Sequence, residues 1–172
     1  MEWGRPVHQD RLLFEFLLLE SFQAGLSWLT VLKKRENFRA AFDAFNYNRI
    51  ADYNESDRQR LMQDAGIIRN KLKIEAAINN AQAFQKVIEE NGSFNNYIWS
   101  FVDFKPIKNH YRTSDQLPPN TTLSDFISKD LKRRNFKFVG TTIIYSFMQA
   151  IGMVNDHTQE CYLYNEILAD RE

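Results

Sequence analysis

The chain has 172 residues, of which 44% are apolar and 14 are phenylalanine, enough for one domain with a substantial hydrophobic core. Lysine plus arginine and aspartate plus glutamate number 22 each, and this zero net charge excludes a strong overall attraction for nucleic acid. Any DNA contact must depend on a local basic patch. One cysteine excludes an intrachain disulfide, and no signal-peptide core or membrane-length apolar run occurs. We expect a cytoplasmic protein without membrane contact.

The most informative stretch of the sequence joins two predicted helices. The first helix covers 12–22 and is mostly apolar, and Glu20 in it follows three leucines. A buried carboxylate must be paired with a cation or put to use. Gly25 lets the chain turn, and Ser27 is suited to cap a second helix that runs from Trp28 to about residue 42.

The residue types alone leave two interpretations of this junction open. Glu20 can cap a helix or pair with Arg35 or Lys33 while Trp28 lies in the core, and such structural roles are the commoner ones for perturbed carboxylates. Alternatively, the carboxylate of Glu20, the amide of Gln23 and the indole of Trp28 hold a flat, nitrogen-rich ligand by its edge and face.

Helical spacing and capping residues predict an all-α protein, because almost no segment is typical of a strand. The proline-rich connection over 104–120 is the candidate boundary between two lobes of a single domain, 1–172. Further helices are expected over 46–53, over 57–63 with Ser56 as the cap, over 70–90, after Ser93, over 123–134 with Ser124 as the cap, and from Thr141 onward.

The turn around Gly66 is a candidate DNA contact. One helix ends before it, an apolar hairpin follows, and a new helix starts near Asn70. This order resembles a helix-hairpin-helix, which directs backbone N–H groups and a helix N-terminus toward a DNA phosphate. Arg69, Lys71 and Lys73 would supply positive charge nearby. An ordinary corner between two helices is an equally good interpretation.

A second basic segment precedes the last predicted helix. Lys132, Arg133, Arg134 and Lys137 come before a helix start at 140–142, which is suited to bind a phosphate. A solvated basic turn beside a core helix is at least as consistent with the sequence.

Taken together, these segments resemble DNA-3-methyladenine glycosylase I, the Tag family. The resemblance implies a helix-hairpin-helix glycosylase fold that binds double-stranded DNA, flips out an alkylated adenine and hydrolyses its bond to deoxyribose. It also implies that no cofactor is needed for this chemistry, and we expect the protein to be a monomer. The matching segments occur in the family's order at 2–4, 23–28, 31–37, 63–69, 99–101, 136–142 and 155–157.

The resemblance also implies roles for single residues. Glu20 matches the catalytic carboxylate that recognises the base, expected to act by recognition and electrostatics, while Trp28, Ser146 and Trp3 match the base pocket. Relatives in the wider superfamily use an aspartate after the hairpin, and this chain has none between Asp64 and Asp103. The residues expected at the DNA are Gln23, Gly25, Leu26, Gly66, Ile67, Arg69, Lys71, Lys137 and Thr141.

The family pattern includes a structural zinc site and an upstream Tyr-His-Asp-x-Glu-Trp-Gly segment, neither of which is complete here. His157 and Cys161 match half of the zinc site, but a structural site needs four ligands and the chain has no second cysteine, so a bound zinc is the less favoured expectation. The chain begins at the last residues of the upstream segment. Either Met1 is an internal methionine of a longer protein, or this is a natural short form with a weakened pocket.

Two other functions stay open at this point. A catalytically inactive helix-hairpin-helix module would bind duplex DNA in a salt-dependent manner and release no base. A helical protein-interaction domain would bind no DNA even at low salt. Zero net charge favours the second of these, and the basic cluster at 132–137 opposes it.

Overall fold

The computed structural model describes residues 4–158 and 160–161. Its helices are α1 (Asp10–Gln23), α2 (Trp28–Lys33), α3 (Arg35–Ala41), α4 (Tyr47–Ala51), α5 (Glu55–Gln63), α6 (Lys71–Asn91), α7 (Phe94–Ser100), α8 (Thr122–Arg133) and α9 (Thr141–Ala150), with 3-10 turns at η1 (Asp43–Phe45) and η2 (Ser114–Gln116). Two short strands, β1 (Ile107–Lys108) and β2 (Val154–Asn155), pair in parallel. The all-α prediction is confirmed. Within the described ranges, no helix is long and apolar enough to cross a bilayer.

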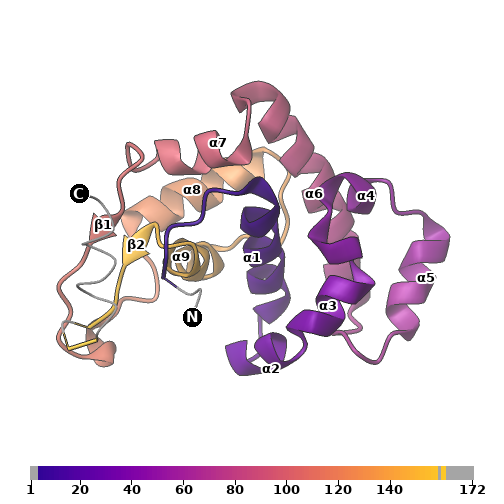
Figure 1. The fold of residues 1–172 in the computed structure, drawn as a ribbon, viewed down its shortest axis with the longest axis horizontal. Helices are drawn as coiled ribbons and strands as arrows, with labels where there is room; N and C mark the ends of the chain where they lie inside the picture. Colours follow the sequence, from indigo (N-terminus) through magenta and orange to yellow (C-terminus); the bar gives the residue numbers. More distant parts are fainter. Residues whose placement is uncertain (1–3, 159, 162–172) are drawn as a thin grey trace.

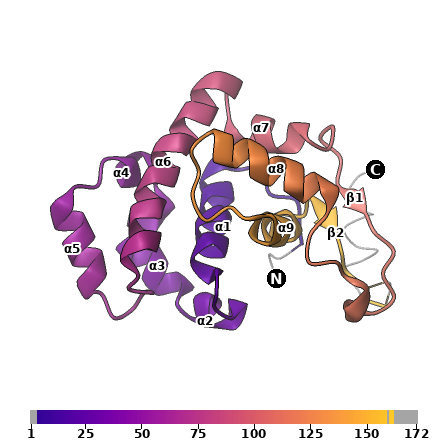
Figure 2. The ribbon, with the colours of Figure 1, turned by 180° about the vertical axis from the view of Figure 1, so that it is seen from behind.

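Helix α1 is the central element of the fold (Figure 1). It contacts α2, α6, α7 and α9, and every residue from Leu13 to Phe22 is buried. Figures 1 and 2 show α9, with α7 and α8 beside it, on one side of α1, and α3 to α6 on the other. A helix surrounded by protein buries all of its faces. The carboxyl group of Glu20 is therefore carried into the interior.

Side-chain caps set several helix boundaries, and two predicted caps are wrong. The side chain of Asn54, not that of Ser56, accepts the first N–H groups of α5. Thr121, not Ser124, caps α8, and Ser124 takes the reciprocal position of a capping box. Both errors arise because a serine within the first turn resembles a cap. The predicted helix from 28 to 42 is also divided, at Lys34, into α2 and α3.

The strand pair lies where the sequence shows no strand signal. The N–H of Ile107 donates to the carbonyl of Met153 at 3.0 Å, and the N–H of Asn109 donates to that of Asn155 at 3.2 Å. These bonds tie the connection over 104–120 to the segment that follows α9. The division into two lobes at this connection stays a prediction.

Candidate functional site

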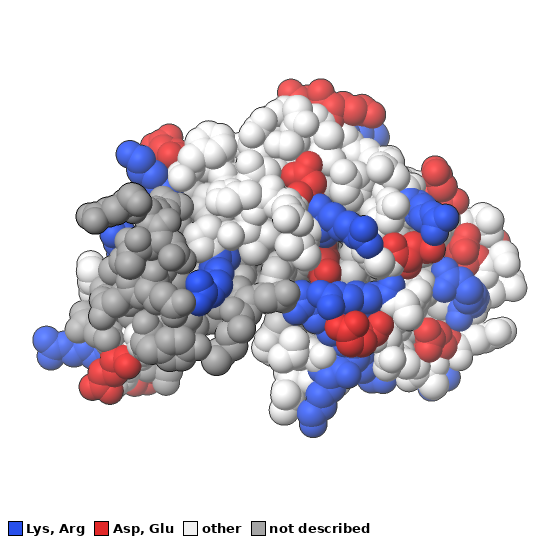
Figure 3. Space-filling view, in the orientation of Figure 1, with Lys and Arg blue, Asp and Glu red and all other residues white. Residues whose placement is uncertain are grey.

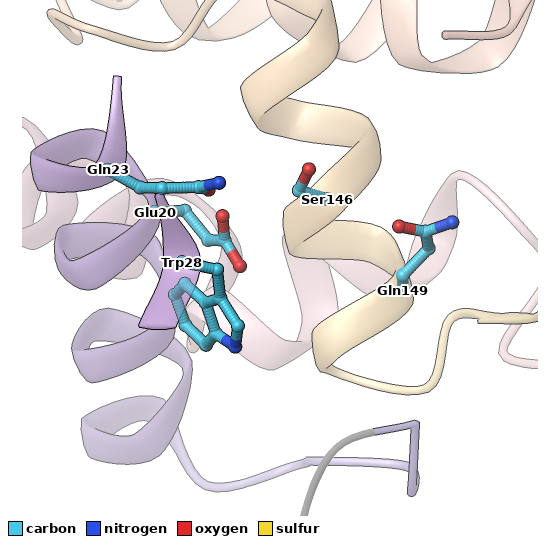
Figure 4. A pocket seen from close by; sticks show the side chains of 5 residues that line it. All are labelled: Glu20, Gln23, Trp28, Ser146 and Gln149. Atoms are coloured by element: carbon cyan, nitrogen blue, oxygen red, sulfur yellow. The ribbon is translucent and has the colours of Figure 1, made fainter. Parts of the chain in front are cut away.

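A pocket of about 310 Å³ lies between the end of α1 and one face of α9 (Figure 4). Glu20 and Gln23 come from α1, Trp28 begins α2, and Ser146 and Gln149 come from α9. Figure 4 shows the Glu20 and Trp28 side chains on one wall and those of the two α9 residues on the other. The structure thus brings together Glu20, Trp28 and Ser146, which the sequence predicts at the base pocket.

The carboxyl group of Glu20 is buried. The residue is 2% exposed, its Oε2 atom has no hydrogen bond, and no ion pair joins it to another described residue. The alternative in which Glu20 pairs with Arg35 or Lys33 is wrong, because Arg35 Nε donates to Glu15 Oε1 at 2.6 Å and Lys33 is exposed.

The burial of Glu20 changes its protonation. It raises the pKa of Glu20 to about 8, since removal from water disfavours the charged carboxylate. In the free protein, a carboxyl group with this pKa is mostly neutral at pH 7. A positive charge that enters the pocket restores the ionised form.

The end of α1 is held in place by a lysine from α6. Lys73 is 7% exposed, and its Nζ atom donates to the carbonyls of Phe22 at 2.7 Å and Ala24 at 2.6 Å. The last carbonyls of a helix have no partner within it and favour a cation. Burial lowers the pKa of Lys73. Contrary to the prediction, Lys73 does not present its charge to DNA.

The turn after α1 takes the predicted form. Gly25 has a φ of +78°, and nothing lies within 4 Å of the position of a Cβ atom there, so the backbone conformation rather than space requires glycine. Ser27 Oγ accepts the N–H of Thr30 at 3.2 Å and caps α2. Leu26, between them, is 41% exposed. The turn therefore exposes an apolar side chain next to residues that line the pocket.

The hairpin around Gly66 is held by side chains from its own turn, from Lys34 between α2 and α3, and from α3. The N–H of Gly66 donates to Asp64 Oδ1 at 2.7 Å, and its carbonyl accepts from Asn37 Nδ2 and Lys34 Nζ, each at 3.2 Å. Ile67 is 3% exposed and belongs to the core. Gly66 and Ile67 therefore shape the hairpin, and the N–H of Gly66 is engaged inside the protein.

Exposed basic residues surround the start of α6. Arg69 and Lys71 are exposed, and the first N–H groups of a helix have no partner within it. Lys137 is also exposed, while its backbone N–H and carbonyl are both bound by the buried Asn80. Figure 3 shows further basic side chains gathered over α2 and α3 among acidic ones. DNA binding by these groups stays a prediction.

Thr141 and Trp3 are the remaining predicted site residues. Thr141 begins α9, and its hydroxyl lies 2.9 Å from Ser124 Oγ. Trp3 lies outside the described residues.

The predicted half of a zinc site has its two residues side by side. His157 Nδ1 lies 3.6 Å from Cys161 Sγ, close enough for both to bind one ion. Among the residues that the structure places, however, no group of three or more possible ligands occurs. A structural zinc needs four ligands, so these residues do not fit a closed site.

Gln149 is the pocket residue that sequence reasoning missed. It lies three positions after Ser146 on α9, and this spacing puts both side chains on one face of the helix. In the sequence, only this spacing from Ser146, which the family resemblance assigns to the pocket, points to Gln149.

The chain matches the sequence model of a family described as methyladenine glycosylase over residues 1–164. It is 51% identical to DNA-3-methyladenine glycosylase 1 of Escherichia coli (strain K12) over 163 residues, which are 95% of this chain and 87% of that protein. A solved structure described as 3-methyladenine DNA glycosylase I (TAG) superposes with a TM-score of 0.89 and 53% identity, covering 94% of this chain and 88% of that one. A variant of 3-methyladenine DNA glycosylase I in complex with 3-methyladenine has a TM-score of 0.91 and 38% identity, covering 93% and 86%.

Proposed function

This chain belongs to the methyladenine glycosylase family, and we propose that it hydrolyses the N-glycosidic bond of 3-methyladenine in alkylated DNA. The buried carboxyl group of Glu20 lines the pocket, and its Oε2 atom has no hydrogen bond to any described residue; this observation carries the proposal. The family prediction made from the sequence is confirmed. The inactive DNA-binding module is not favoured, because relatives are named as glycosylases and one similar structure holds 3-methyladenine.

The pocket selects its base by charge. Methylation at N3 makes the purine a cation and a good leaving group, so its bond to deoxyribose breaks more easily than that of an unmodified base. The cation favours ionisation of Glu20, and the indole of Trp28 offers it a π face. A neutral base gains neither interaction. Extrusion from the duplex also costs less for a damaged base than for a paired one.

The proposed DNA contacts come from the turn after α1, the hairpin and start of α6, and the segment that leads into α9. Double-stranded DNA with an alkylated adenine is the partner, and the protein acts on it as a monomer. The turn with Gln23, Gly25 and Leu26 enters the space that the base leaves. Arg69, Lys71 and Lys137 contact phosphates, together with the start of α6 behind Gly66 and Ile67 and the start of α9 at Thr141.

For hydrolysis, the protein needs to supply little more than the base pocket and the DNA contacts described above. The bond from C1′ to the base breaks, and its electron pair leaves with the base as neutral 3-methyladenine. Positive charge develops on the sugar, and water attacks C1′ and gives up a proton to the solvent. The Glu20 carboxylate lies on the base side of that bond and acts by recognition and electrostatic stabilisation. The chemistry draws on no cofactor. A zinc ion bound by His157 and Cys161 would have a structural role only.

The test measures free 3-methyladenine released from methylated duplex DNA. We expect release by the wild type and a rate about 100-fold lower for Glu20→Gln, which keeps the shape but cannot ionise. Glu89→Gln, an exposed residue of α6, serves as the matched control and keeps the full rate. No release by the wild type would support the inactive module, and a full rate in Glu20→Gln would refute the role of Glu20.

A further inference from the structure

Gln149 turns a hydrogen-bond acceptor into the pocket. Its Nε2 atom donates to Asp156 Oδ2 at 2.7 Å. Figure 4 shows the side-chain oxygen of Gln149 on the pocket side and the nitrogen pointing away, on the wall opposite Glu20. The wall formed by α9 therefore offers an oxygen acceptor that faces the carboxyl group across the pocket.

The orientation of the Gln149 amide follows from the chemistry of Asp156. Asp156 is 3% exposed and accepts three hydrogen bonds, from Asn109 Nδ2 at 2.6 Å, the Tyr145 hydroxyl at 2.6 Å and Gln149 Nε2 at 2.7 Å. A carboxylate offers only acceptors, so each neighbour must turn a donor toward it. The amide of Gln149 can meet it only with its NH2 group, which leaves Oε1 for the pocket.

The fold holds Asp156 in place from two sides. Asp156 directly follows β2, and Asn109 directly follows β1, so the parallel strand pair sets the two residues next to each other. Tyr145 lies one helical turn before Gln149 on α9. A strand pair and a helix thus converge on one carboxylate, which fixes the amide of Gln149 before any ligand arrives.

We propose that Gln149 is a specificity-determining residue whose Oε1 atom accepts a hydrogen bond from the bound base, and that Asp156 is the positioning residue that acts through it. This inference rests on the proposed function of the pocket and adds a second acceptor to Glu20. The exocyclic amino group of a 6-aminopurine is a hydrogen-bond donor and suits acceptors on both walls. A 6-oxopurine presents a carbonyl oxygen, and an acceptor facing an acceptor is strongly disfavoured.

The experiment compares the affinity for free 3-methyladenine with that for its 6-oxo counterpart, 3-methylhypoxanthine, by calorimetry. Gln149→Met keeps the length of the side chain and removes its acceptor. We expect it to weaken binding of 3-methyladenine about tenfold and to reduce the preference over 3-methylhypoxanthine by the same factor. Gln59→Met, an exposed residue of α5, is the matched control and binds both bases as the wild type does.

A double-mutant cycle tests the role of Asp156. Asp156→Leu has a similar shape and removes both acceptors, Oδ1, which binds Asn109, and Oδ2, which binds Tyr145 and Gln149. It therefore frees the Gln149 amide to rotate and weakens the preference for 3-methyladenine. In the Gln149→Met background the same change has no further effect on base affinity, because Asp156 acts through Gln149. Additive losses in the double variant would refute the positioning role, since a purely structural effect of Asp156 would persist without Gln149.

The outcomes separate this inference from the function on which it rests. A wild type that neither binds nor releases 3-methyladenine would contradict the proposed function. An active wild type with unchanged selectivity in Gln149→Met would contradict the inference alone. If Asp156→Leu fails to fold, the Gln149→Met variant still decides whether the amide oxygen contacts the base.

Discussion

At the scale of single residues, Glu20 is a group whose burial destabilises the protein and prepares it for function. Its carboxyl group lies in the interior without a hydrogen-bond partner on Oε2, so the free protein holds it mainly in the neutral form. A cationic base supplies the missing interaction. The stability that the free protein loses to this buried acid is recovered when the ligand binds.

Glu20→Gln should stabilise the free protein at alkaline pH. The pKa of Glu20 is raised from 4.5 to about 8, so the wild type loses stability as the pH rises through this range, and glutamine does not. The loss between pH 5 and pH 8 is on the order of 3 kcal/mol. Urea denaturation at both pH values measures it, and Glu89→Gln is the control. An equal stability difference at both pH values would contradict the buried, neutral acid.

The residues of the pocket differ in how far the sequence reveals them. Glu20 stands out because it is a carboxylate within an apolar helix, and Trp28 because it follows the turn at Gly25. Gln149 carries no such signal, since glutamine on a helix is commonly solvated. The role of Gln149 depends on its hydrogen bond to Asp156. Asp156 is placed by the pairing of β1 with β2, which the local strand propensity of the sequence does not predict.

At the scale of elements, α1 and α6 are joined by one buried cation. Lys73 lies in the first turn of α6, next to the hairpin expected to contact DNA, and binds the end of α1, next to the pocket. The same side chain therefore links the two parts of the proposed site. The sequence predicts both helices well, because spacing and caps are local signals. It wrongly predicts that Lys73 points toward DNA, whereas the side chain points toward the end of α1.

Lys73→Met should destabilise the protein and slow base release. Methionine fills similar space but leaves the carbonyls of Phe22 and Ala24 without their donor, at a cost of about 1–3 kcal/mol. Denaturant unfolding measures this loss, and single-turnover release of 3-methyladenine measures the loss of position at the pocket. Lys86→Met, an exposed lysine of α6, should change neither. Wild-type stability in Lys73→Met would show that the two carbonyl contacts contribute nothing.

At the scale of the whole molecule, a protein without net charge must bind DNA through a few placed cations. The overall helical fold follows from apolar periodicity along the chain. The exposed cations follow only from the packing of α6 and the turn before α9. Long-range pairing of β1 with β2 joins residues nearly 50 positions apart, and such contacts leave little trace in local sequence.

Glutamine in place of Arg69, Lys71 and Lys137 should weaken the binding of duplex DNA whatever the DNA sequence is. Each lost phosphate contact lowers the slope of log K against log salt by about 0.9, so the slope should fall by about 3 in the triple variant. Fluorescence anisotropy at several salt concentrations measures it. The same exchange at Lys86, Lys105 and Lys129, which are also exposed, is the control. An unchanged slope in the variant of Arg69, Lys71 and Lys137 would show that these residues do not contact DNA phosphates.

The pH dependence of kcat/KM for release of 3-methyladenine from methylated duplex DNA shows whether a buried acid selects the charged base. The substrate stays cationic in the range tested, so the profile reports the ionisation of the free enzyme. For the wild type, we predict a rise of about tenfold per pH unit that levels off near pH 8, and for Glu20→Gln a low rate that does not change with pH. A flat profile for the wild type, or the same rise in Glu20→Gln, would contradict the claim that a buried acid selects the charged base.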